Sequence, residues 1–181
     1  MKNELEKLKY PIGRFNLPTN VSNDAIQEAL GVLEDFPMKL MSATSSLSRD
    51  QLDYRYRPEG WTIKQVVHHC ADSHMNSIIR FKLALTEKQP IIKPYLEDKW
   101  ADLTDYQDYD LDAPLSILRG VHHKLVQILS NLDSKERSKT FKHPEHGQLF
   151  RIDQALMMYA WHSRHHLAHV EEAMKLEGSN W

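Results

Sequence analysis

Hydrophobic residues recur every three or four positions in four separate stretches of the chain, which is the spacing of an amphipathic helix. The four predicted helices span about 23–47, 63–86, 115–132 and 152–176. Thr62 followed by Gln65 forms a capping box at the start of the second helix, and Gly178 is a helix-stop signal after the fourth. Pro37 is expected to kink the first helix. This pattern therefore predicts an all-α protein.

The segments between these helices have no sustained period. Residues 1–20 are predicted to be an irregular arm, 48–53 a short capped turn, and 133–151 either a small hairpin or a loop. The connection over 87–113 is long, with a possible short helix at 96–103. Such a connection allows a bundle to depart from simple up-and-down order. We therefore predict one domain over 1–181, a four-helix bundle with a long connection between its second and third helices.

Composition narrows the classes of protein that fit. A single cysteine, Cys70, among 181 residues excludes an intramolecular disulfide framework and favours a reducing cytoplasm. A net charge of -2 without a basic stripe argues against nucleic acid as a partner. The chain contains no run of roughly 18 apolar residues, so no membrane span is predicted. We expect a cytoplasmic protein that acts on a small molecule.

Histidine is the unusual residue, with eleven in the chain and seven of them between His68 and His74 or between His162 and His169. On the last predicted helix, His162, His166 and His169 share the apolar face. His162 and His166 are one turn apart, so both rings can reach one metal ion. The alternative is a network of cleft histidines without metal. The zincin motif is absent, because no glutamate follows His162.

The third ligand is ambiguous from periodicity. His74 lies on the apolar face of the second helix, and this pattern alone favours it. His69 falls nearly opposite, in a polar row that is either solvated surface or the wall of a cleft. The members of that row are His69, Asp72, Ser73, Asn76 and Arg80. Cys70, which follows His69, is predicted to be a small buried hydrophobic residue.

Four motifs, in this order, resemble the YfiT-like branch of the DinB superfamily, whose members are described as metal-dependent hydrolases. They are YPIGRF, GWTIKQVVHHCADSHMNSIIRFKLALTE, IKPY with Trp100, and YAWHSRHHLAHV. The resemblance covers nearly the whole chain. It implies a four-helix bundle, a homodimer, and one divalent metal, zinc or nickel, on three histidines. Carried onto matching positions, the implied ligands are His69, His162 and His166.

This resemblance replaces His74 by His69 and implies that the polar row lines a cleft. His68 and His165 then lie outside the ligand set. His169 and Asp72 are candidates to orient the ligand rings through the ring nitrogen that does not bind metal. Candidate general bases are Asp72, His74 and His122.

Three imidazoles leave an open coordination position, as catalytic zinc sites require. The first functional hypothesis is a hydrolase that activates water. The second is a transferase that activates a low-molecular-weight thiol, since related superfamily members use bacillithiol or mycothiol. Arg80, Lys82 and Arg151 are candidates to bind the carboxylates of such a thiol. The third reading is a metal-binding module without catalysis.

Overall fold

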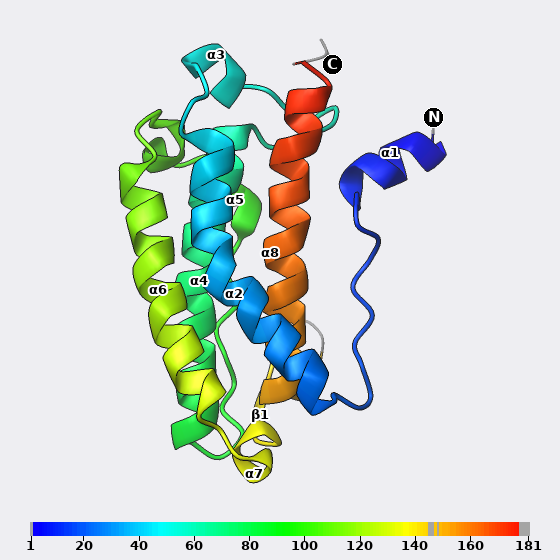
Figure 1. The fold of residues 1–181 in the computed structure, drawn as a ribbon, viewed down its shortest axis with the longest axis vertical. Coiled ribbons are helices and arrows are strands. Elements are labelled where there is room, and N and C mark those ends of the chain that lie inside the picture. Colours follow the sequence, from blue (N-terminus) through cyan, green and yellow to red (C-terminus); the bar gives the residue numbers. More distant parts are fainter. Residues whose placement is uncertain (1, 145–146, 148, 178–181) are drawn as a thin grey trace.

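Four long helices form the body of the molecule (Figure 1). The computed structural model describes residues 2–144, 147 and 149–177, with side chains described from residue 4 onward. The four helices are α2 (Asn23–Thr44), α4 (Ile63–Thr86), α6 (Asp112–Ser130) and α8 (Ile152–Lys175). The predicted all-α four-helix bundle is confirmed. No helix of the described chain combines the length and the apolarity needed to cross a membrane.

The bundle does not follow simple up-and-down order. The main contacts join α2 to α6 and α8, and α4 to the same two helices, so the consecutive helices α2 and α4 lie on a diagonal. Figure 1 shows α2 and α8 running in one direction and α4 and α6 in the other. The long connection from α4 returns along the bundle to begin α6, and it contains α5 (Glu97–Ala101) and the 3-10 helix η1 (Thr104–Gln107).

Local sequence signals set the helix ends. The Thr62 and Gln65 capping box is present, and α4 has the predicted bounds. A second capping box at Ser48 starts the short helix α3 (Arg49–Leu52), where a capped turn was expected. Pro37 lies within α2 without ending it. The predicted stop at Gly178 lies outside the described residues.

The N-terminal arm is only partly irregular. Residues Lys2–Lys9 form a helix, α1, which corrects the expectation of an irregular arm over 1–20. The stretch NELEKLK contains good helix formers and no glycine or proline, and these favour one short helix. The following segment runs beside α8, where the Trp161 indole donates to the Gly13 carbonyl over 3.2 Å and Gln154 donates to the Pro18 carbonyl over 2.9 Å.

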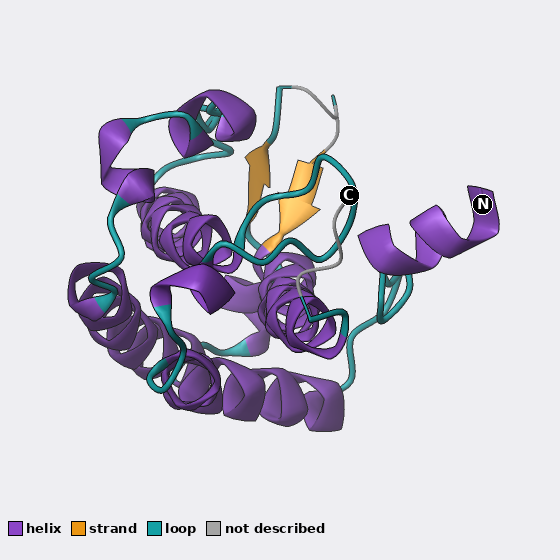
Figure 2. Cartoon of the chain, turned by 90° about the horizontal axis from the view of Figure 1, so that it is seen from above, coloured by secondary structure: helices purple, strands orange, loops and turns teal. Residues whose placement is uncertain are grey.

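The segment before α8 contains a hairpin, one of the two forms expected for it. After the short helix α7 (Ser134–Arg137), strand β1 (Thr140–Lys142) pairs antiparallel with β2 (Leu149–Arg151). Figure 2 shows the pair beside the bundle and α1 outside it. The Lys142 amide donates to the Pro90 carbonyl over 2.9 Å, which fixes the start of the long connection.

The core has two hydrophobic clusters, and buried histidines lie where they meet. Leu33 belongs to one cluster and Phe36 to the other. His122, which is 1% exposed, hydrogen-bonds the Leu33 carbonyl and packs its ring 5.5 Å from that of Phe36. Burying imidazoles is costly unless their nitrogens are paired. The fold therefore holds a polar layer inside its core.

An ion pair secures the start of α4. The Lys64 ammonium lies 2.8 Å from Asp53, whose other carboxylate oxygen accepts a hydrogen bond from Tyr109 over 2.7 Å. Partial burial works against the ionised carboxylate, but Lys64 and Tyr109 outweigh it and lower the pKa of Asp53. The pair therefore stabilises the fold above the unfolded pKa of about 3.9, and this stability is lost as the pH falls through the lower folded pKa.

Replacing Asp53 by Asn is expected to cost about 1 kcal/mol of unfolding free energy at neutral pH. Urea denaturation of both proteins at several pH values measures it, and the difference should shrink below about pH 4. Asp35→Asn is the control, because its pair with Lys39 has both side chains more than half exposed. A difference that does not change with pH would contradict this role for Asp53.

Candidate functional site

Three histidines from two helices converge. His69 projects from α4, and His162 and His166 project from consecutive turns of α8. One ring nitrogen from each lies within 4.8 Å of the others, and the Nε2 atoms of His69 and His162 are 3.2 Å apart. These are the three residues that the resemblance implies. The one-turn spacing of His162 and His166 has the geometric effect expected of it.

The chemistry of this set fits a divalent cation. Burial lowers the pKa of His69 to about 3, and burial and the neighbouring rings lower the pKa of His162 and His166 well below their usual value. The rings are therefore neutral at physiological pH and keep the lone pairs that a metal needs. Among the described residues, the buried Nδ1 of His69 has no hydrogen-bond partner, and a ligand or a water can compensate this polar atom.

The polar row of α4 does not face bulk water. His69 is 1% exposed and Ser73 is 6% exposed. The long connection covers this row: Gln65 donates to the Ala101 carbonyl over 3.0 Å, and Tyr106 donates to Asp72 over 2.7 Å. Periodicity alone misassigns the row because it cannot show that a distant irregular segment packs on a polar helix face.

His74 and His122 lie near the three converging histidines, but both are poor candidates for a general base. His74 is 0% exposed, with Nε2 lying 3.1 Å from Nδ1 of His162 and Nδ1 lying 2.7 Å from Nε2 of His122. The other nitrogen of His122 bonds the Leu33 carbonyl. Every nitrogen of the two rings is thus engaged within the core, so neither ring can accept a proton from substrate or water.

The other residues proposed to lie around the ligands differ in whether they contact them as expected. His169 contacts His166, with their Nδ1 atoms 3.4 Å apart, as expected for a residue that orients a ligand ring. Asp72 accepts from Tyr106 instead, and the structure gives it no hydrogen bond to any of the three converging histidines. His68 stacks on Tyr106 and His165 on Trp161, which is consistent with their exclusion from the ligand set. Asp72 is therefore not supported as an orienting residue or as a base.

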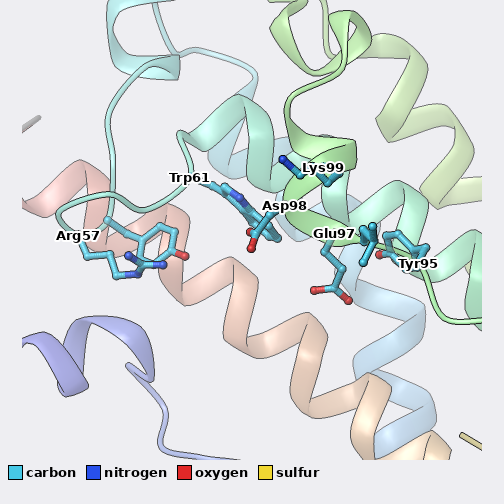
Figure 3. A pocket seen from close by; sticks show the side chains of 8 residues that line it. Arg57, Trp61, Tyr95, Glu97, Asp98 and Lys99 are labelled. Carbon is cyan, nitrogen blue, oxygen red and sulfur yellow. The ribbon is translucent and has the colours of Figure 1, made fainter. Parts of the chain in front are cut away.

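The three rings open into a cavity of about 390 Å³. Trp61 is a wall of it rather than simple packing, since its ring lies 4.5 Å from that of His69. A neighbouring cavity of about 550 Å³ shares Tyr56, Arg57, Trp61 and Glu97 with it. In Figure 3, Arg57 and Trp61 line one side of this second cavity, and Glu97 and Tyr95 line the other.

Glu97 is the functional candidate that sequence reasoning missed. It lines the histidine cavity, the cavity of Figure 3 and a third cavity of about 390 Å³ that also reaches His162. The signal that could have found it is a carboxylate two residues after the IKPY motif, at the start of α5. A residue at the junction of three cavities can reach molecules that bind in any of them.

The third cavity is lined by apolar side chains and by one arginine. Phe15, Phe141, Phe150 and Met158 line it together with Arg80. Arg80 donates to the Tyr159 hydroxyl over 3.0 Å, and its buried Nε has no hydrogen-bond partner in the described part of the chain. By contrast, Lys82 is exposed and Arg151 pairs with Asp153. Of the three basic candidates, Arg80 is the one that the fold places beside His162.

Comparisons with known proteins point to one family. A family model described as the DinB superfamily matches residues 33–170. A protein of Bacillus cereus (strain 03BB102) named "Putative metal-dependent hydrolase" is 46% identical over 171 residues, covering 94% of this chain and 98% of its own. A Bacillus mycoides protein of the same description is 45% identical over 177 residues, covering 98% and 100%.

A solved structure extends the similarity to the fold. YfiT from Bacillus subtilis, described as "a probable metal-dependent hydrolase with an unusual four-helix bundle topology", superposes with a TM-score of 0.92. It is 41% identical, and the match covers 95% of this chain and 98% of that one. The chain therefore belongs to the DinB superfamily and is a YfiT-like member of it.

Proposed function

We propose that this protein is a metal-dependent hydrolase that binds one divalent metal ion on His69, His162 and His166. The observation that carries the proposal is the convergence of three neutral imidazoles, within 4.8 Å, on a cavity that a small molecule can enter. Zinc and nickel are the proposed metals, because both accept imidazole ligands. A cytoplasmic location and a homodimer stay predictions.

When bound, the metal would polarise a substrate carbonyl and lower the pKa of water at the open position. The remaining tasks fall to side chains of the cavity. Glu97 is proposed to accept the proton of the attacking water, because it lines the cavity while Asp72 does not. Arg80 is proposed to bind an anionic group of the substrate, and Trp61 to exclude water from the rings.

Replacing Glu97 by Gln tests the proposed proton acceptor. The variant should keep its metal and lose about a hundredfold in kcat/KM, the order expected for removal of a general base. The matched control is Asp98→Asn, because Asp98 is the next residue and lines the neighbouring cavity but not the histidine cavity. Equal rates for Glu97→Gln and wild type would remove Glu97 from the mechanism.

The hydrolase proposal itself is tested with metal-loaded protein and panels of esters, amides and lactones, with and without an added low-molecular-weight thiol. A hydrolase forms product with water alone. Product that appears only with thiol and an electrophile would replace hydrolysis by thiol transfer, in which the nucleophile comes from solution. Cys70 cannot serve, because it is fully buried and burial raises the pKa of its thiol. No turnover in either panel would favour a binding module.

A further inference from the structure

We propose that two hydrogen-bonded chains of histidines, each ending on a backbone carbonyl, fix the tautomers of His162 and His166 so that both Nε2 atoms offer lone pairs to the metal. The inference rests on the proposed function only for the identity of the metal ligands. It makes His74, His122 and His169 positioning residues. Both chains can be followed atom by atom.

The first chain starts at α2. The Leu33 carbonyl can only accept, so Nδ1 of His122 must carry the proton that it donates there. Nε2 of a neutral His122 then accepts from Nδ1 of His74, 2.7 Å away. Nε2 of His74 in turn accepts from Nδ1 of His162 over 3.1 Å. His162 is left with its proton on Nδ1 and a lone pair on Nε2.

The second chain starts at the end of α1. Nε2 of His169 lies 3.2 Å from the Lys9 carbonyl and must donate to it. Nδ1 of His169 then accepts, and Nδ1 of His166 lies 3.4 Å away. His166 is therefore protonated on Nδ1 as well, with its lone pair on Nε2. The two chains come from different parts of the fold and produce the same tautomer in both ligands of α8.

The direction of each chain is unique as long as every ring carries one proton. Burial supports this condition at the start of the first chain, because it lowers the pKa of His122 to about 4. Reversing either chain would place two protons between neighbouring nitrogens or leave a carbonyl without its donor. No such chain fixes His69, since no residue that the structure describes is a partner of its Nδ1. Its tautomer stays free to change on metal binding.

The first test uses metal-free protein and does not depend on activity. Two-bond proton–nitrogen NMR correlations of protein labelled with nitrogen-15 in histidine identify the tautomer of each ring. We expect the Nδ1–H form for His74, His122, His162 and His166, and the Nε2–H form for His169. The exposed His123 on α6 provides an internal reference. An Nε2–H form at His162 or His166 would overturn the proposal.

The second test interrupts the first chain. His122→Phe keeps a ring of similar size but removes both nitrogens, and the affinity for Zn²⁺ in chelator competition should fall about 10- to 100-fold. His122→Gln can still accept from His74 and donate to Leu33, so it should recover most of the affinity and the Nδ1–H signal of His162. His123→Phe on the exposed side of α6 should change neither.

The outcomes separate the two proposals. A folded His122→Phe protein with wild-type Zn²⁺ affinity would overturn the positioning role. Correct tautomers and weakened binding without any hydrolysis would leave the positioning role intact and contradict only the hydrolase. If His122→Phe fails to fold, the His122→Gln variant and the tautomers of the wild type still decide.

Discussion

Protein in which His69, His162 or His166 is replaced by Ala should contain almost no divalent metal after purification without a metal-affinity column. Loss of one of three ligands removes a coordination bond and leaves a two-histidine site. The fall in affinity should exceed the 10- to 100-fold that loss of an outer hydrogen-bonding residue typically causes. Elemental analysis of each protein, expressed in metal-supplemented medium, measures the metal-to-protein ratio.

The matched controls for this experiment lie within the same two helices. His68 and His165 are each adjacent in sequence to a proposed ligand, yet they stack on Tyr106 and Trp161. Their alanine variants should keep the metal content of the wild type. An undiminished metal content in the three ligand variants would contradict the assignment of the ligands. A lower metal content in a control variant would add that histidine to the ligand set.

Replacing Phe36 by Ala is expected to lower the unfolding free energy by about 3–5 kcal/mol, the range for removing a buried aromatic side chain. Phe36 is 2% exposed and its ring lies 5.6 Å from that of His74 and 5.5 Å from that of His122. The substitution therefore leaves a cavity between the two hydrophobic clusters and removes the packing that holds the histidine chain. Urea denaturation of the metal-free protein measures the change.

Met38 provides the control for Phe36, because it lies two residues further along α2 and is 54% exposed. Met38→Ala should change the unfolding free energy by less than about 0.5 kcal/mol. If both variants unfold at the same urea concentration, Phe36 does not stabilise the core as its burial implies. The metal content of folded Phe36→Ala would further show how far the packing supports the site.

The fold follows from local signals to a large extent. Helical spacing and the Thr62 capping box predict α4 with its observed bounds, and the one-turn spacing of His162 and His166 predicts their convergence. Local propensity is less decisive at the edges. Met41 follows the apolar spacing of α2 but is 36% exposed, because helix packing covers only part of that face.

Features that depend on distant contacts were not predictable from periodicity. The face of His69 is buried because the long connection packs on it, and this took the resemblance to a known family to infer. Glu97 reaches the site only because the same connection returns along the bundle. The contact of His122 with Leu33 spans 89 positions of sequence. Nothing in a single sequence states such pairings, whereas capping and spacing act within one or two turns.

The hydrogen bond between His169 and Lys9 has a consequence for how the protein is made. It joins residues 160 positions apart, one in α1 and the other in α8. A nascent chain that ends before α8 contains only His69 of the three converging histidines. The proposed metal site is therefore complete only after α8 has been synthesised and has packed against α4, which would protect the unfinished chain from binding a metal ion in the wrong geometry.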